Sequence, residues 1–218
     1  MADVIIWLVI LDFLFKKRRE KQKRAAQHYA TGRAGERNVC KFLIKTGVAQ
    51  EQIFRNVYLP AYNGQTTEID ILVVSRKGIL IFENKACHGT IYGDGRNRQW
   101  LQYIGHEQHT IANPLRQNRF HAKCLKKYLK NPKIPVIPFT TKDPEVVWKV
   151  RNISRKDHFI RHEEDFLKIY RKLPNCAAMP RYYNDLLKTF RKLEKQRSAV
   201  RDEHARQVNR RLKAIHKR

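Results

Sequence analysis

The sequence predicts an α/β protein in which helical and strand-like segments alternate along most of the chain. A helical pattern ends near Gly47 and is followed by strand-like runs at 53–59 and 66–82. A second helical pattern covers 114–130 and precedes another strand-like run at 134–139. Apolar residues three or four positions apart indicate a helix, whereas short β-branched runs bounded by Gly and Pro indicate strands. At 218 residues, the chain is long enough for one hydrophobic core with appendages.

The first element is an apolar segment followed by a basic run. Residues 4–15 are apolar apart from Asp12, and a helix of this length spans about 18 Å, against about 30 Å for the hydrocarbon core of a membrane. Two interpretations stay open: contact with the inner face of the cell membrane from the cytoplasmic side, and docking on the protein's own core or on a partner. We therefore treat 1–24 as a separate segment, with candidate nucleic-acid contacts at Lys16, Lys17, Arg18 and Arg19.

The central segment, 25–173, has the composition of a soluble domain and contains both strand-like regions. Between 88 and 113 the chain is rich in Gly, Asn, Gln and His, and this length without a strong pattern predicts a functional loop. Pro114 suits the first position of the helix that follows. Pro135 and Pro138 lie in the next strand-like run and predict that this strand lies at an edge of the sheet.

The last segment, 174–218, is predicted to be a basic helical tail. From 181 onward it holds 13 basic and 4 acidic residues. Its first half carries an apolar stripe that can pack on the domain, whereas its second half is expected to be solvated or bound to a partner. Candidate nucleic-acid contacts in the tail are Arg191, Lys192, Arg210 and Arg211.

The net charge and the cysteine content indicate which partners and which cellular compartment to expect. The chain has 46 Lys and Arg against 20 Asp and Glu, which gives a net charge of +26. Such an excess favours a polyanionic partner, DNA in the first place, with RNA not excluded. The four cysteines are far apart and form no CxxC pair, which predicts unbridged thiols in a reducing compartment such as the cytoplasm.

The stretch 66–86 is predicted to form a β-hairpin that carries acidic residues at one end. If Arg76 and Lys77 form a two-residue turn, Asp70 lies opposite Glu83. A three-residue turn containing a bulge would instead place Asp70 opposite Asn84. In the first register two carboxylates lie roughly 4.5 to 5.5 Å apart at their Cβ atoms, and such a pair is expected to bind a cation.

Asp70, Glu83 and Lys85 together suit the hydrolysis of a phosphodiester. Two carboxylates with water and phosphate as further ligands suit Mg²⁺, with Mn²⁺ as an alternative. A bound divalent ion polarises the phosphodiester and lowers the pKa of a bound water. Lys85 is two residues from Glu83, on the same face of the strand, where its charge can stabilise the transition state. The plain alternative is a solvated strand end with an ion pair.

Several motifs agree in order and spacing with one known family. They are Gly32, Gly35 and Glu36 in a helix, then TTEID at 66–70, ILIFENKA at 79–86, and NPLRQN at 113–118. In this order they resemble the NERD domain, the nuclease-related domain of bacteria, which is assigned to the PD-(D/E)xK nuclease superfamily. The resemblance covers roughly 31–139. One departure is Asn84, because the middle residue of the ExK motif is usually apolar.

The resemblance implies a restriction-endonuclease-like core of order α-β-β-β-α-β, with helices flanking a central mixed sheet. It implies that Asp70 and Glu83 are metal ligands and that Lys85 is the catalytic lysine. Glu36 matches an acidic residue of the first helix that can approach the metal, and Gln117 matches a helix glutamine near the site. The function expected is metal-dependent hydrolysis of DNA. The alternative is a catalytically silent module that binds nucleic acid or associates with a membrane.

Overall fold

The computed structural model describes residues 32–61, 64–85, 87–142, 146–154, 156–160 and 162–215, with side chains up to 210. The predicted apolar helix and basic run at 1–24, with Lys16, Lys17, Arg18 and Arg19, lie outside the described residues, and so does the side chain of Arg211. Within the described part of the chain, no helix has the length and apolar character needed to cross a membrane.

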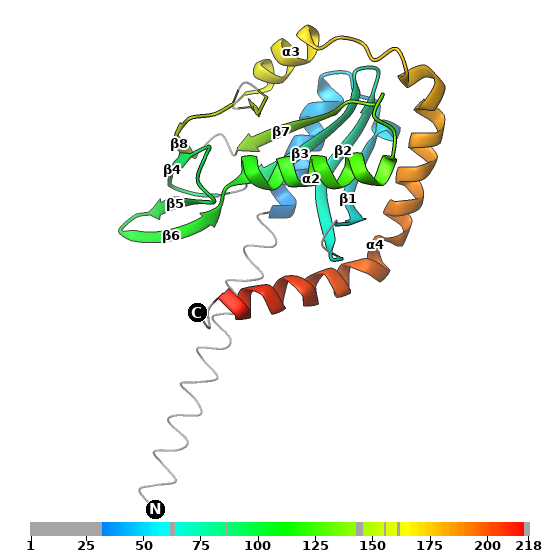
Figure 1. The fold of residues 1–218 in the computed structure, drawn as a ribbon. Helices are drawn as coiled ribbons and strands as arrows, with labels where there is room; N and C mark the ends of the chain where they lie inside the picture. Colours follow the sequence, from blue (N-terminus) through cyan, green and yellow to red (C-terminus); the bar gives the residue numbers. More distant parts are fainter. Residues whose placement is uncertain are drawn as a thin grey trace, which may run out of the picture.

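The centre of the fold is a mixed sheet of five strands in the order β1-β2-β3-β7-β9. Its first three strands are antiparallel neighbours, and β7 and β9 then run parallel to β3. The predicted α/β class is therefore confirmed, with a mixed sheet between helices (Figure 1). The strands are β1 (Ile53–Pro60), β2 (Thr66–Ser75), β3 (Gly78–Lys85), β7 (Val136–Lys142) and β9 (His158–Ile160).

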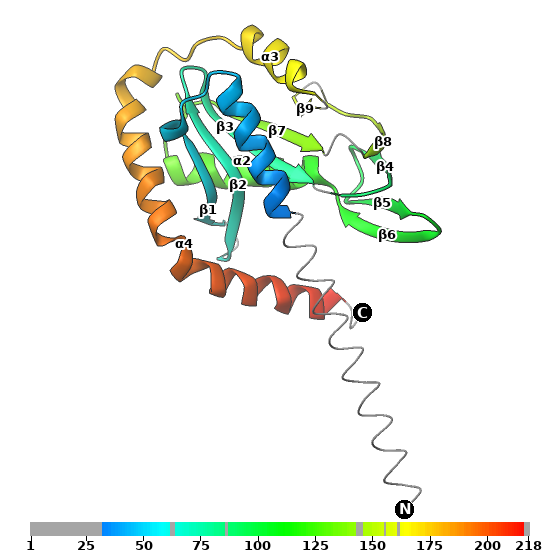
Figure 2. The ribbon, with the colours of Figure 1, turned by 180° about the vertical axis from the view of Figure 1, so that it is seen from behind.

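Helices cover both faces of this sheet (Figures 1 and 2). The first helix, 32–45, and α3 (Glu163–Lys172) pack on one face. The other face is covered by α2 (Pro114–Leu129) and by the first part of α4 (Met179–Ile215). Side chains alternate between the faces of a strand, and in β3 they do so from Ile79 to Phe82, which makes this strand buried on both sides.

A second, smaller sheet stands where the sequence predicts a loop. Its order is β6-β5-β4-β8, and three of its strands come from the expected loop at 88–113. That expectation is wrong, and Gly93 shows why. A Cβ atom at Gly93 would lie 2.5 Å from the ring of the buried Trp100, so this glycine allows close packing inside a strand and does not mark a turn. The strands are β4 (Thr90–Asp94), β5 (Gln99–Ile104), β6 (Glu107–Ala112) and β8 (Val147–Arg151).

The predicted edge position of the strand after α2 is also wrong. β7 lies between β3 and β9, so it is an internal strand. Pro138 is tolerated inside the sheet because β9 is short. β9 pairs with β7 only from Phe139 to Thr141. Pro138 comes before the paired residues. On the β9 side it therefore faces no strand, and no hydrogen bond is lost because proline has no N–H.

The long helix α4 begins along the side of the main sheet and then changes direction. Phe190 is fully buried there and lies 5.7 Å from Phe54 between ring centroids. Its last part crosses the ends of β1 and β2 (Figures 1 and 2). There Gln207 accepts a hydrogen bond of 3.0 Å from the Thr66 N–H. The second half of α4 was expected to be solvated or bound to a partner, but its inner side contacts the sheet.

Candidate functional site

The hairpin of β2 and β3 has the register that a two-residue turn predicts. Ser75 pairs with Gly78, and the pairing continues to Ile71 with Phe82. Gly78 has a φ of 127°, which favours glycine. Beyond Phe82, β3 pairs with β7 on its other side as far as Lys85. The pairing of β2 with β3 therefore ends directly before Asp70 and Glu83. The two carboxylates lie where the two strands are no longer paired.

Asp70 lies at an irregular point of the sheet. Ile71 packs with the first helix, whereas Ile69 packs on the α2 side, although residues two apart share a face in a regular strand. Asn56 is skipped in the recorded pairing with β2 and has a φ of 51°. The side chain of Asp70 accepts a hydrogen bond of 3.0 Å from the backbone N–H of Asn84. The Asp70 carboxylate thus accepts the hydrogen bond that a backbone carbonyl would accept in a regular sheet, and this bond holds it beside β3.

The environment of Asp70 disfavours its ionised form. Burial raises its pKa well above the usual range, and the charge of Glu83 adds to this effect. The nearby ammonium of Lys85 and the Asn84 N–H act in the opposite direction but do not cancel it. The hydrogen bond from the N–H of Asn84, the residue after Glu83, holds Asp70 beside the part of β3 that carries the other predicted metal ligand.

Glu83 is almost fully buried, with 1% of its surface exposed. Burial opposes its ionisation, but Lys85 and His121 outweigh burial and lower its pKa. One carboxylate oxygen lies 2.7 Å from Lys85 Nζ, and the other lies 3.2 Å from His121 Nε2. Glu83 is therefore a carboxylate at neutral pH with cationic or polar partners on both oxygens.

Lys85 is held by two predicted site residues from different elements. Its ammonium contacts Glu83 and donates a hydrogen bond of 3.1 Å to the side-chain oxygen of Gln117 on α2. Burial lowers the pKa of Lys85, but the charges of Glu83 and Asp70 reverse this and raise it. The lysine is therefore protonated at neutral pH, as an electrostatic role requires. Asn113 caps α2 and so fixes where Gln117 lies.

Glu36 approaches the site from the first helix without touching Lys85. It accepts a hydrogen bond of 3.3 Å from Asn56 and lies 3.8 Å from the guanidinium of Arg55. Burial raises its pKa, and these two partners oppose the rise. Asn56 also donates to Glu68 at 3.1 Å. Asn56 therefore joins two carboxylates that line the same cavity as Asp70.

His121 is a functional candidate that the sequence prediction did not include. It lies one turn after Gln117 on α2, is buried, and has Nδ1 at 2.7 Å from Thr67 Oγ1. Its other ring nitrogen faces Glu83. The only sequence signal is the spacing of four residues from Gln117, which places both side chains on one side of a helix. Contact with Glu83 depends on how α2 packs on the sheet.

Two adjoining cavities lie beside this cluster and share Glu68, Asp70 and His204 in their lining, whereas Glu83 and Lys85 line neither of them. One, of about 800 Å³, extends toward the first helix and includes Glu36. The other, of about 420 Å³, extends toward α2 and includes Gln117. Arginines line both cavities, namely Arg33, Arg197 and Arg201 in the larger and Arg98 and Arg116 in the smaller. The larger cavity also contains the carboxylates of Glu36 and Asp202, so arginines and acidic side chains alternate around Asp70.

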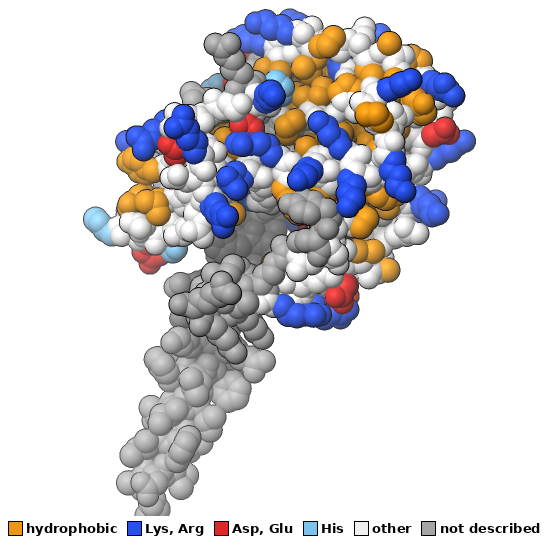
Figure 3. Space-filling model, in the orientation of Figure 1, with side chains coloured by type: hydrophobic (Ala, Val, Ile, Leu, Met, Phe, Trp, Pro, Cys, Tyr) orange, Lys and Arg blue, Asp and Glu red, His pale blue; other side chains and the backbone are white. Residues whose placement is uncertain are grey.

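The predicted contacts of the basic tail do not gather in these cavities. Arg191 is exposed and donates to the carbonyl of Glu51 at the other end of β1. Lys192 is exposed as well. Arg210 is exposed and pairs with Glu203 at 3.5 Å. Other basic side chains cover much of the face that Figure 3 shows, with few acidic ones among them.

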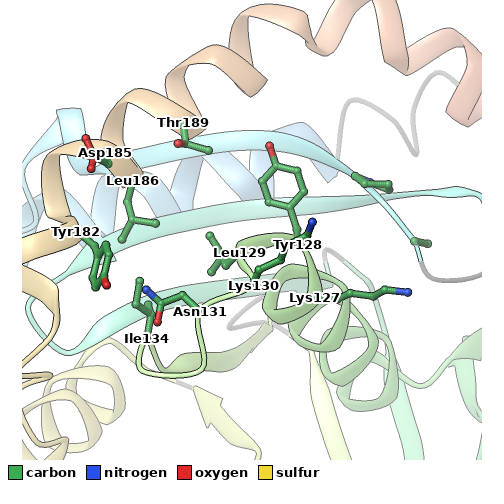
Figure 4. A pocket seen from close by; sticks show the side chains of 12 residues that line it. Lys127, Tyr128, Leu129, Lys130, Asn131, Ile134, Tyr182, Asp185, Leu186 and Thr189 are labelled. Atoms are coloured by element: carbon green, nitrogen blue, oxygen red, sulfur yellow. The ribbon is translucent and has the colours of Figure 1, made fainter.

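Another cavity, of about 770 Å³, lies between α2 and α4 and has a different character. Tyr128 and Leu129 from α2 and Tyr182 and Leu186 from α4 contribute to its lining (Figure 4). It contains none of the predicted site residues.

The donor set at Asp70 and Glu83 fits a hard divalent cation in chemistry. Carboxylate oxygens are the ligands that Mg²⁺ prefers, and water commonly fills its other positions. Glu83 Oε2 is buried and makes no hydrogen bond of good geometry. Among the described residues, no group of three or more His, Cys, Asp or Glu is arranged to hold a metal ion. Two protein carboxylates with water and phosphate are therefore the set that this site offers.

Comparisons with known proteins identify the family of the chain. The family model for the nuclease-related domain matches residues 31–141. An uncharacterized protein of Bacillus anthracis is 28% identical over 165 residues, which are 76% of this chain and 74% of that protein. No solved structure matches. The matched residues contain Glu36, Asp70, Glu83, Lys85 and Gln117, and they cover half of the chain. The chain belongs to the nuclease-related domain family.

Proposed function

We propose that the protein is a metal-dependent nuclease that hydrolyses phosphodiester bonds in DNA. The observation that carries the proposal is the contact of the Glu83 carboxylate with the Lys85 ammonium, 2.7 Å apart, beside Asp70 at the meeting point of two arginine-lined cavities. A carboxylate pair alone occurs at many strand ends. A carboxylate pair with a half-buried lysine, beside cavities that carry arginines, is suited to bind a phosphate and to stabilise extra negative charge on it.

Asp70 and Glu83 would hold the metal, Mg²⁺ or Mn²⁺. When bound, a divalent ion polarises the phosphodiester and lowers the pKa of a bound water. Lys85 binds a phosphate oxygen and remains protonated while negative charge grows there. Gln117 keeps the lysine in place, and His121 keeps Glu83 turned toward the site. Arg98 and Arg116 neutralise phosphates on the α2 side of the reaction centre.

The test uses the full-length protein with linear duplex, circular duplex and single-stranded DNA, in Mg²⁺, Mn²⁺ or EDTA. We expect cleavage in Mg²⁺ or Mn²⁺ and none in EDTA. Glu83→Gln and Lys85→Ala should each lower the rate by at least about a hundredfold, the scale of losing one preorganised electrostatic group. Glu107→Gln, in the exposed β6, is the control. Cleavage that persists in both site variants would exclude this site from the reaction.

The second candidate is a silent module that binds nucleic acid through charge, and the net charge of +26 favours it. It predicts binding that weakens steeply with salt and that is the same in Glu83→Gln. It also predicts no metal-dependent product with DNA or RNA. A product that appears with Mg²⁺ and disappears in Glu83→Gln would exclude it. Membrane contact through 4–15 stays a prediction.

A further inference from the structure

The last part of α4 forms a wall of both cavities at the candidate site. In the larger cavity, α4 supplies Arg197 and Arg201 opposite Glu36 and Asp70. In the smaller cavity it supplies His204 and Val208. The remaining walls come from the first helix, from β1 and β2, and from α2 with the adjoining strands of the small sheet. Asp70 therefore lies beneath a helix and not on an open face of the protein.

Specific contacts join this part of α4 to β2. The hydroxyl of Thr66 donates to Gln207 at 3.1 Å and lies 2.8 Å from His204 Nδ1. The His204 ring packs edge-on against Tyr58, with 5.3 Å between centroids, and its Nε2 lies 4.0 Å from a Glu68 oxygen. These contacts close the space at its outer side. The two cavities are then two halves of one passage that meets at Glu68, Asp70 and His204.

The size of the passage limits what can reach Asp70. Cavities of about 800 and 420 Å³ are in the range of pockets that hold one small molecule, about 300 to 1,000 Å³. A few linked nucleotides of one strand fit this space. A duplex is less suited to it, because two paired strands need more space than one.

The lining of the passage matches a single nucleic-acid strand. Arginines line it on either side of Asp70, three in one half and two in the other, where they can pair with phosphates. In the larger half Glu36, Glu68 and Asp202 lie among the arginines, and Arg201 contacts Asp202 at 3.2 Å. The smaller half also has the half-buried ring of Phe120, on which a base can stack, whereas Tyr58 in the larger half is buried against His204. Cations and aromatic rings along a narrow channel are typical of proteins that bind single strands without sequence preference.

We propose that the substrate is a single nucleic-acid strand with a free end, which passes beneath the last part of α4. This inference rests on the proposed function, because it names the substrate of the same site. A strand without an end cannot enter a passage that is closed by the contacts of Thr66 with His204 and Gln207. Closed circular single strands are therefore excluded, whereas linear single strands and the single-stranded ends of duplexes are accepted.

The first experiment measures the binding of DNA to the Glu83→Gln variant in EDTA, where no cleavage takes place. The probes are a linear single-stranded DNA and its closed circular form of the same sequence. We expect the linear form to bind at least about tenfold more tightly, a difference of about 1.4 kcal/mol. Equal binding of both forms would overturn the inference. This measurement does not depend on activity, so it stands even if the protein cleaves nothing and the proposed function fails.

Cleavage by the unmodified sequence is then compared with that by the double variant His204→Ala with Gln207→Ala. The double variant removes the closing contacts, and we expect the preference for linear over circular single strands to fall toward one. Asn209→Ala, an exposed position on the same helix, should keep the preference of the unmodified protein. Cleavage of circular single strands at the linear rate by the unmodified protein would overturn the inference, as would an unchanged preference in the double variant.

Discussion

At the residue scale, Asp70 connects the chemistry of the site with the stability of the fold. Its raised pKa means that the folded state binds this proton more tightly than the unfolded chain does. The resulting stabilisation is fully present below the pKa of an unfolded aspartate, about 3.9, and is lost as pH rises through the folded value. At neutral pH without metal, the buried carboxyl of Asp70 therefore lowers the stability of the protein.

Asp70→Asn should consequently raise the thermal midpoint in EDTA at neutral pH. A gain of about 2 to 4 °C corresponds to 1 kcal/mol in a chain of this size. The gain should shrink as pH falls through about 4, because below the pKa of an unfolded aspartate the unmodified carboxyl is protonated in both states. Thermal unfolding across this pH range checks it, with Glu107→Gln as the exposed control. A midpoint of Asp70→Asn at or below that of the unmodified protein at neutral pH would contradict the prediction.

His121 is expected to act on the metal through Glu83. Outer partners of metal ligands commonly change metal affinity by about 10- to 100-fold when they are replaced. His121→Ala should therefore raise the Mg²⁺ concentration needed for half-maximal thermal stabilisation by that factor. A titration of the thermal midpoint with Mg²⁺ measures this without any substrate, and His106→Ala, exposed in the turn before β6, is the control. An unchanged titration would make the 3.2 Å contact between His121 and Glu83 merely structural.

The carboxylates and the lysine of this site were predictable from the sequence, and their companions were not. Asp70, Glu83 and Lys85 follow from strand alternation and turn length, which act over short distances along the chain. Asn56 and His121 reach the site through the irregular point of β1 and through the packing of α2. The spacing of His121 from Gln117 places both on one side of α2, but the contacts of His121 and Asn56 depend on how separate elements meet.

At the scale of elements, the small sheet depends on one close contact between β4 and β5. Gly93→Ala would place a methyl group 2.5 Å from the Trp100 ring. Overpacking of this kind typically costs about 1 to 3 kcal/mol, so we expect a clear fall in the denaturation midpoint. Gly32→Ala, where a Cβ atom meets nothing within 4 Å, should leave the midpoint equal or higher. Equal stability of both variants would mean that Trp100 moves aside freely.

The elements that the sequence predicted well are those with a repeated local pattern. The helices at 32–45 and 114–129, the hairpin and the long tail helix all carry such a pattern. The small sheet does not, because β6 has no buried residue and β4 carries Gly93. Its strands are held by pairing with one another and with β8, a segment that follows β7. Pairing partners so distant in sequence cannot be read from any single stretch.

At the scale of the whole molecule, the net charge and the arginines of the passage make separate predictions about salt. If Arg98 and Arg116 contact phosphates, Arg116→Gln should reduce the slope of log affinity against log salt by about 1, and so should Arg98→Gln. Arg191→Gln, at the far end of β1, should change the slope less. Binding of linear single-stranded DNA to Glu83→Gln over a range of salt concentrations measures the slopes. Equal changes of the slope in all three variants would mean that the whole protein attracts DNA through its net charge and that the strand follows no defined path along Arg98 and Arg116.

The position of His204 and Gln207 near the end of the sequence has a consequence for synthesis. Chains leave the ribosome from the N-terminus, and domains fold as their segments emerge. Asp70, Glu83, Lys85 and Gln117 are all made before the part of α4 that lies across them. The acidic centre is therefore synthesised before its cover, so a nascent chain passes through a stage in which the site is still open to the solvent.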